Sequence, residues 1–174
     1  MAHDFDLIVL GAGSGGVAAS RRAASHGAKV AIIEAGRVGG TCVLRGCVPK
    51  KLLMYAAQYG DAFAEAAGYG WQLPADAPAF DMAVWQAAKT AETARLEGVY
   101  RAMLADGGVE LVAGHARFVD AHTVEVNRQR LRGRHLLIAT GASPVRDTVA
   151  GIAPCPTSDD LLDLAALTER AAVI

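Results

Sequence analysis

The sequence predicts an α/β fold in which helices flank a parallel β-sheet. Residues 7–10 form an uninterrupted apolar run, a segment with helical spacing follows, and a second apolar segment occupies residues 29–34. A strand that is buried on both faces of a parallel sheet requires a continuous apolar run, whereas a strand with one solvated face would alternate. Residues 7–34 therefore predict a strand–helix–strand unit, the building block of a parallel sheet.

The composition allows one domain with a sizeable core and an appendage. The chain has 174 residues, of which 52% are hydrophobic, and its formal net charge is -1. Such a balanced charge gives no reason to expect a nucleic acid or an anionic membrane surface as a partner. No apolar stretch reaches membrane-spanning length and no cleavable leader is recognisable, so we expect a cytoplasmic protein.

Three glycines follow the first predicted strand at the spacing of a dinucleotide-binding turn. Gly11, Gly13 and Gly16 form a G-x-G-x-x-G pattern, and Glu34 ends the second strand. In such a unit the first glycine makes a tight turn, the second lets the backbone approach a pyrophosphate, and the third lets the helix pack closely on the strand. Glu34 would bind ribose hydroxyls and repel a 2′-phosphate. The pattern predicts a Rossmann-like domain for the adenosine diphosphate group of FAD or NAD.

The following segments predict two helices and a small antiparallel β insertion. Helical spacing covers residues 50–71 and 80–108, and shorter β-like segments occupy residues 109–120, 122–127 and 134–141. On the second helix we expect one shared face, made of Met82, Trp85, Ala88, Leu96, Val99, Tyr100 and Met103. Four alternating arginines predict the solvated face of a hairpin, because no aromatic residues are interleaved as a nucleic-acid site would require. They are Arg128, Arg130, Arg132 and Arg134.

The chain divides at about residue 150. Residues 1–150 are predicted to form the dinucleotide-binding domain, and residues 151–174 to form a linker, a short helix and the first strand of a second domain. That strand, residues 171–174, would need a turn and a partner strand beyond it. We therefore expect a chain that is cut at the threshold of a second domain.

The segment GGTCVLRGCVPKK sets Cys42 and Cys47 five positions apart, and three interpretations compete. A zinc site is disfavoured because no further cysteine or histidine lies at a familiar spacing, so we expect no metal. Two inert buried cysteines are the plainest alternative. A redox pair is favoured because Pro49 suits the first turn of a helix, whose dipole would, with Lys50 and Lys51, favour the thiolate form of Cys47.

A disulfide between these two cysteines demands a distorted backbone. Five residues of regular helix separate two Cα atoms by about 7.5 Å of rise, beyond the ~6.8 Å that a disulfide tolerates. The surrounding glycines, and the effect of Pro49 on Val48, make such a distortion possible. A dithiol beside a dinucleotide favours flavin over nicotinamide, because flavin both accepts hydride and reacts with thiolates. The alternatives are a plain NAD-binding module with an incidental cysteine pair and a non-catalytic FAD-binding module.

With these motifs, the chain resembles the FAD-dependent pyridine nucleotide-disulfide oxidoreductases. The resemblance rests on GAGSGG, Glu34, GGTCVLRGCVPKK and LLIATG, and it extends over nearly the whole chain. It implies that residues 1–150 are the N-terminal part of an FAD-binding domain. It also implies three catalytic residues: Cys47 beside the flavin, Cys42 attacking the substrate, and Lys50 near the reactive flavin nitrogen. The implied cofactor contacts are Gly11, Gly13, Ser14, Gly15, Gly16, Glu34, Gly40, Thr41, Cys42, Lys50, Ala116, Thr140 and Gly141.

The resemblance also bears on the substrate. Lys50 stands where members that reduce glutathione, trypanothione or thioredoxin carry lysine, and Ser14, Arg21 and Tyr100 match a glutathione-binding set. Members that reduce the cationic trypanothione carry an acidic residue where Ala18 stands, so charge complementarity favours anionic glutathione disulfide. The full-length enzyme would be a homodimer that takes electrons from NADPH.

Two departures from the family pattern qualify this expectation. The residues VLRG between the cysteines replace the commoner VNVG, which should leave the chemistry unchanged. The chain also lacks the family's second glycine-rich motif, its later GD segment and its C-terminal His-Glu pair. We therefore expect this chain alone to be inactive.

Overall fold

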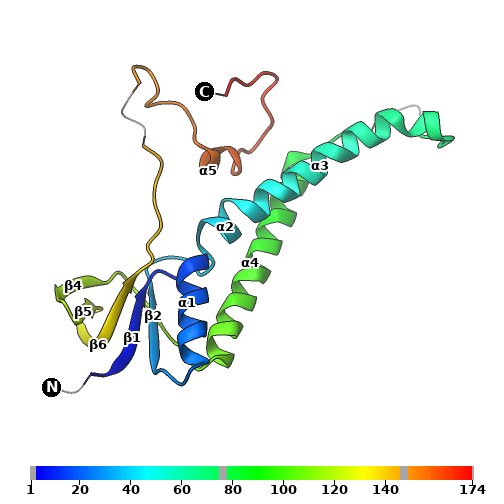
Figure 1. Ribbon diagram of the computed structural model, residues 1–174. Coiled ribbons are helices and arrows are strands. Elements are labelled where there is room, and N and C mark those ends of the chain that lie inside the picture. The colour runs from blue at the N-terminus through cyan, green and yellow to red at the C-terminus, as the bar shows by residue number, and fades with distance from the viewer. Residues whose placement is uncertain (1–2, 75–77, 146–148, 174) are drawn as a thin grey trace.

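The computed structural model describes residues 3–74, 78–145 and 149–173. These residues form a sheet with helices packed beside it and a two-helix arm that projects away from the sheet (Figure 1). The elements in chain order are β1 (Phe5–Leu10), α1 (Ser14–Ala24), β2 (Val30–Glu34), α2 (Gly40–Leu44), α3 (Cys47–Glu65), the 3₁₀ helix η1 (Ala66–Tyr69), α4 (Met82–Asp106), β3 (Glu110–Ala113), β4 (Arg117–Asp120), β5 (Thr123–Val126), β6 (Gln129–Ile138) and α5 (Ser158–Leu161).

The strands follow the order β3-β2-β1-β6-β5-β4. β1 pairs in parallel with both β2 and β6, and β2 pairs in parallel with β3. β4, β5 and the first part of β6 pair antiparallel, so β6 belongs to both parts of the sheet. The predicted Rossmann-like α/β fold with a small antiparallel insertion is confirmed. The carboxyl ends of β1 and β2 meet at one edge, which is where ligands bind in open α/β sheets.

The two faces of the parallel strands enter two separate hydrophobic clusters. Side chains of successive strand residues point to opposite faces, so Val9 and Ile32 face one cluster while Ile8 and Ile33 face the other. The first cluster includes Val17 of α1, together with a residue near the end of α4. The second is closed by residues of β5. The continuous apolar runs of the sequence thus reflect burial on both faces.

Helix α4 buries a different set of residues from the one that its apolar pattern predicts. Ala88 and Val99 are exposed, whereas Lys89 and Thr93 are buried. The buried positions of α4 are Met82, Trp85, Lys89, Thr93 and Leu104. The prediction of a shared apolar face that includes Ala88 and Val99 was wrong, because two inner positions carry bonded polar side chains. Lys89 bonds to the C-terminal segment, and the hydroxyl of Thr93 donates to the carbonyl of Thr90 within the helix.

The predicted hairpin of alternating arginines is the β5–β6 pair. Asn127 and Arg128 form its turn, with φ angles of 52° and 65°. Exposed Arg130 lies 3.6 Å from a carboxylate oxygen of Glu125 on the partner strand. Arg132 is half-buried rather than solvated, so the prediction of a fully solvated arginine face holds only in part.

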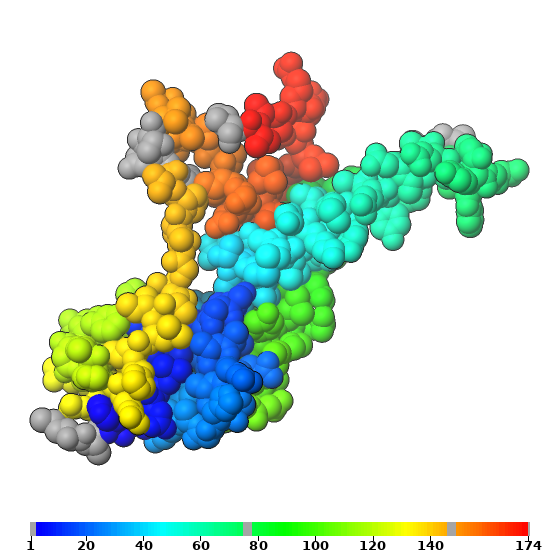
Figure 2. All heavy atoms as spheres, viewed as in Figure 1, coloured from blue at the N-terminus to red at the C-terminus, as the bar shows by residue number. Residues whose placement is uncertain are grey.

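The C-terminal segment returns to the helices after leaving β6. It approaches the junction of α2 and α3, where α5 lies (Figures 1 and 2). Residues 171–173 form no strand, and Ile174 lies outside the described residues, so the predicted strand over 171–174 is not formed at its first three positions. An apolar run becomes a strand only when a neighbouring strand supplies hydrogen bonds. Within the described ranges, no helix has the length and apolar character needed to cross a membrane.

Candidate functional site

A cleft of about 1030 Å³ opens at the carboxyl ends of β1 and β2. The turn after β1 forms one end of the cleft, and the helices α2 and α3 with both cysteines form the other. Eleven of the predicted site residues line it: Gly11, Gly13, Ser14, Gly15, Glu34, Gly40, Thr41, Cys42, Cys47, Thr140 and Gly141. The fold thus brings the glycine turn, the terminal acid of β2 and the cysteine segment into one cavity.

The glycine end of the cleft is shaped by close backbone contacts. Any Cβ on Gly16 would collide with the carbonyl oxygen of Gly11, so α1 can begin directly against the turn only with glycine there. A Cβ on Gly40 would lie 2.6 Å from the Cα of Gly13, and Gly40 has a φ of 62°. The turn after β1 and the start of α2 therefore touch backbone to backbone. Gly13 caps α1 without a side-chain hydrogen bond, which leaves the helix N-terminus open to an anion.

Glu34 is oriented by two backbone amides. Its Oε2 accepts a hydrogen bond of 2.6 Å from the amide of Ala12, and its Oε1 accepts one of 2.8 Å from the amide of Gly36. The carboxylate is half-buried and lines the cleft. Each carboxylate oxygen has further lone pairs, so Glu34 can still accept hydrogen bonds from a ribose. The bonds to Ala12 and Gly36 fix where such a sugar could lie.

The cysteine end is built from two helices that meet at a break. α2 ends at Leu44, and Arg45 and Gly46 both have a φ of -142°, far from helical values. Cys47 is the first residue of α3, so the predicted distortion between the cysteines and the helix start beside Pro49 are both present. The break lets two residues five positions apart face one another, which a continuous helix would prevent.

The two cysteines differ in exposure. Cys42 is half-buried and Cys47 is exposed, and both are free thiols in this structure. A hydrogen bond with Cys47 raises the pKa of the Cys42 thiol, and partial burial and the neighbouring charge of Cys47 act in the same direction. The hydroxyl of Ser14 opposes them with a hydrogen bond that lowers the pKa. These contacts place the two thiols beside one another and place Cys42 beside Ser14, the first residue of α1.

Five predicted residues lie outside the lining of the cleft. Gly16 contributes by packing, as described above. Lys50 is exposed on α3, and Ala116 packs against the cluster on the β5 side of the sheet. Tyr100 packs against the hydrophobic cluster on the α1 side of the sheet. Arg21 lies beside the end of α4, where a Cβ built on Gly107 would be 3.9 Å from its Cγ. The roles of these residues toward cofactor or substrate stay predictions.

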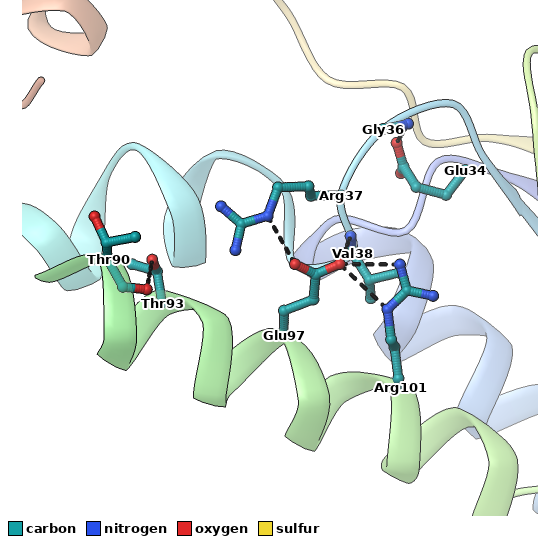
Figure 3. Close-up of polar contacts among 8 residues, drawn as sticks. All are labelled: Glu34, Gly36, Arg37, Val38, Thr90, Thr93, Glu97 and Arg101. Carbon is teal, nitrogen blue, oxygen red and sulfur yellow. Dashed lines mark hydrogen bonds and ion pairs between the residues drawn. The ribbon is translucent and has the colours of Figure 1, made fainter. Parts of the chain in front are cut away.

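The sequence did not point to a polar cluster that ties the loop after β2 to α4 (Figure 3). Arg37 donates a 2.7 Å hydrogen bond to Glu97, Arg101 donates one of 2.9 Å, and the amide of Val38 donates one of 3.3 Å. Although burial alone would raise it, these bonds hold the pKa of Glu97 below its usual range. The carboxylate thereby fixes a cleft-lining loop. The i,i+4 spacing of Glu97 and Arg101 could have predicted their ion pair, but nothing in the sequence indicated the bonds to Arg37 and Val38.

The far wall of the cleft was also missed. Lys89, Thr90 and Thr93 of α4 line the cavity, and so do Asp159 and Asp163 of the C-terminal segment. No local pattern links positions about seventy residues apart, so only the fold brings these residues together.

Comparisons with known proteins agree with this architecture. The sequence model of the family described as pyridine nucleotide-disulphide oxidoreductase matches residues 5–174. A glutathione reductase of Burkholderia cepacia is 53% identical over 172 residues, which cover 99% of this chain and 38% of the relative. A glutathione reductase of a Nostoc strain is 44% identical over 174 residues, which cover 100% of this chain and 38% of the relative.

A more distant relative extends the same picture. The chloroplastic/mitochondrial glutathione reductase of Pisum sativum is 41% identical over 182 residues, which cover 99% of this chain and 33% of the relative. The chain thus spans 33–38% of the length of these three relatives.

Proposed function

The chain belongs to the pyridine nucleotide-disulphide oxidoreductase family, and we propose that it is the N-terminal, FAD-binding portion of a glutathione reductase. The observation that carries this proposal is that Cys42 and Cys47 line the same cleft as the glycine turn and Glu34. A dinucleotide bound by the turn would extend toward the two sulfurs. The names of the relatives support glutathione disulfide as the substrate, and the family description supports a pyridine nucleotide, which we propose to be NADPH, as the source of electrons.

The donor groups of the cleft suit FAD. The uncapped N-terminus of α1 and the Gly13–Gly40 approach offer amides and open space to a pyrophosphate, and Glu34 offers oxygens to a ribose. Thr41, Thr140 and Gly141 would hold the remainder of the cofactor along the cleft. Bound FAD supplies two-electron transfer between a nicotinamide and a disulfide. The negative charge of Glu34 would repel a 2′-phosphate, so the site would favour an adenosine without that group.

The cysteine pair would carry out thiol–disulfide exchange with the substrate. The Cys42 thiolate attacks one sulfur of glutathione disulfide, forms a mixed disulfide and releases one glutathione thiolate, which takes up a proton. The Cys47 thiolate then attacks the Cys42 sulfur, forms the Cys42–Cys47 disulfide and releases the second glutathione. Two electrons and two protons restore the dithiol. The exposed position of Cys47 and the helix break leave room for the second attack.

Substitution of each cysteine tests this proposal in the full-length protein. Cys42→Ser and Cys47→Ser should each lower NADPH-dependent reduction of glutathione disulfide by at least about a thousandfold, because both exchange steps need a sulfur nucleophile. Cys155→Ser is the matched control, since Cys155 lies outside the cleft lining and bonds to the carbonyl of Gly151. Turnover that survives Cys47→Ser, or that falls equally in the Cys155 variant, would contradict the proposal.

The choice of substrate needs a separate measurement. Arg21→Ala should raise the KM for glutathione disulfide several-fold more than the KM for NADPH, because it removes a cation that the anionic substrate would meet. Arg22→Ala, one position along the same exposed helix end, is the control. Equal effects of the two variants would return Arg21 to the role of a solvated surface residue. Gel filtration of the full-length protein tests the homodimer.

A further inference from the structure

The C-terminal segment is bonded to α4 by a buried lysine. We call residues 158–164 the docking segment. Only 7% of the Lys89 side chain is exposed, and its Nζ donates a 2.9 Å hydrogen bond to the carbonyl of Leu162 and pairs with the carboxylate of Asp163. Gln86, one turn earlier on the inner side of α4, donates bonds of 3.0 Å and 2.8 Å to the carbonyls of Leu162 and Leu164. Charge-assisted and neutral bonds thus converge on one short stretch of backbone.

An apolar contact completes the docking. Leu162 is 6% exposed and packs with Met82 and Trp85 of α4, and the cluster is extended by Leu52 and Leu53 of α3. α3 is the helix that begins with Cys47. The docking segment therefore contacts both long helices, close to α2 and the start of α3 (Figure 1).

A second ion pair joins the docking segment to the cysteine motif itself. Arg45 lies between Cys42 and Cys47, at the break between α2 and α3, and its Nη1 lies 3.6 Å from a carboxylate oxygen of Asp159. Both residues of the pair line the cleft, as both cysteines do. A cation at this position favours the thiolate form of a reduced cysteine pair, whereas the carboxylate offsets it.

We propose that Lys89 and Arg45 are positioning residues: Lys89 latches the docking segment onto the helices that carry the cysteines, and Arg45, held by Asp159 of that segment, sets the charge beside the cysteine pair. The proposal goes beyond the proposed function, and its first test requires neither flavin nor substrate. The latch also fixes where the chain that follows the docking segment starts relative to Cys42 and Cys47.

Lys89→Met distinguishes a local role of Lys89 in holding the docking segment from a role in the stability of the whole fold. The methionine keeps the length and apolar stem of the side chain, and the carboxylate that loses its partner, Asp163, is 67% exposed and is left in water and not as a buried charge. The hydrogen bond to Leu162 is nevertheless lost. Hydrogen–deuterium exchange of the amides of Leu161 to Leu164 should become at least about tenfold faster, while exchange in β1 and β6 stays unchanged. Lys89→Arg should restore much of the protection.

Arg95→Met is the matched control for the exchange experiment. Arg95 forms an exposed ion pair with Glu92 on the same helix and does not touch the docking segment. Unchanged exchange in Lys89→Met, or equal acceleration in Arg95→Met, would contradict the proposal that Lys89 holds the docking segment on α4. Should Lys89→Met fail to fold, Gln86→Ala removes two of the bonds and is expected to give a smaller acceleration in the same amides.

Two substitutions that should shift the dithiol–disulfide equilibrium in opposite directions test the role of the charge of Arg45. The full-length protein is equilibrated at pH 8 with mixtures of reduced and oxidised dithiothreitol. Reduced dithiothreitol gives two electrons and two protons to the Cys42–Cys47 disulfide and is itself oxidised to a ring disulfide. Alkylation and cleavage after glutamate then release residues 35–65, which hold both cysteines and no third one. Mass spectrometry of this peptide gives the reduced fraction.

We expect Asp159→Asn to shift the equilibrium about threefold toward the dithiol, because Arg45 loses its counter-charge, and Arg45→Gln to shift it about threefold the other way. A purely structural ion pair would move both variants in the same direction. Equal signs, or no shift in either variant, would overturn the assignment of Arg45. A peptide that is doubly alkylated at every ratio would contradict the proposed function and the role of Arg45 with it, but would leave the exchange result for Lys89 valid.

Discussion

The two ends of the cleft are built in different ways. The glycine end is the turn after β1, whose backbone touches the backbone of Gly40 at the start of α2, and it rests on strands that are almost fully buried. The cysteine end consists of side chains on two helices and of a segment that joins them from more than one hundred residues further along the chain. The first end is therefore fixed by local spacing, and the second by long-range contacts.

The difference predicts how each end responds to mutation. Backbone contacts cannot be relieved by a change of rotamer, so an added methyl group at the glycine end should cost much of the stability of the domain. Polar side chains at the cysteine end can move apart, and water can replace their bonds. We expect smaller losses there, with effects on local geometry before effects on global folding.

The largest expected effect is at Gly16. Gly16→Ala places a Cβ against the carbonyl oxygen of Gly11, and we expect a loss of about 3 kcal/mol or more in the free energy of unfolding. Gly15→Ala is the control, because a Cβ there meets no atom within 4 Å. Urea denaturation of the two variants decides the matter. A Gly16 variant as stable as the Gly15 variant would show that α1 can slide along β1.

Gly40 tests the contact that joins the two ends. Gly40→Ala combines a positive φ of 62° with a Cβ only 2.6 Å from the Cα of Gly13, and we expect it to cost about 2 kcal/mol. Gly141→Ala has a similar φ of 75° but no atom within 4 Å, so it measures the conformational part alone, about 1 kcal/mol. The difference between the two variants is the cost of separating the turn from α2. Equal losses of unfolding free energy in the two variants would mean that the turn after β1 and the start of α2 are not in close contact.

This contrast also explains what the sequence could predict. Leu7 to Leu10 and the three glycines encode the strand, the turn and the helix start within a few residues of one another, so periodicity and spacing were sufficient. The break between the cysteines was predictable for the same reason, because Gly46 lies in it and Pro49 marks the first turn of the helix that follows.

Lys89 and Thr93 were not predictable from the sequence. Both occupy inner positions of α4 where an apolar residue is expected, and Lys89 is buried only because the carbonyl of Leu162 and the carboxylate of Asp163 receive it. A polar residue on an apolar helix face usually predicts a solvated face. The reasoning failed at Lys89 because its partners come from a distant segment, and at Thr93 because its hydroxyl bonds to the carbonyl of Thr90 within the helix.

Glu97 allows a pH-dependent test of the side-chain end. The loop between β2 and α2 rests on this carboxylate, whose side chain is only 14% exposed. Burial acts to raise its pKa, but hydrogen bonds from Arg37, Arg101 and the amide of Val38 keep the pKa lowered in the folded state. The stabilisation is therefore complete above the unfolded pKa of about 4.3 and is lost as the pH falls through the folded value.

We expect Glu97→Gln to lower the free energy of unfolding by about 1–2 kcal/mol at neutral pH and by less at an acidic pH below the lowered folded pKa of Glu97, where the parent carboxylate is itself protonated. Denaturant titrations of parent and variant at both pH values measure this difference. A difference that is as large in acid as at neutral pH would show that Glu97 acts through its shape and not through its charge.

The smallest expected effect is at the start of α4, on the arm that carries the buried lysine. The carboxylate of Asp81 accepts hydrogen bonds from the amides of Ala83 and Val84, at 2.8 Å and 3.2 Å, and caps the helix. Asp81→Ala should cost about 1 kcal/mol, whereas Asp81→Ser should restore most of it, because a hydroxyl can cap as well. Hydrogen exchange at the first turn of α4 should accelerate without a change at the glycine turn. If exchange at the glycine turn accelerates equally, the two ends of the cleft unfold as one unit, and the distinction between a local end and a long-range end applies to their construction but not to their stability.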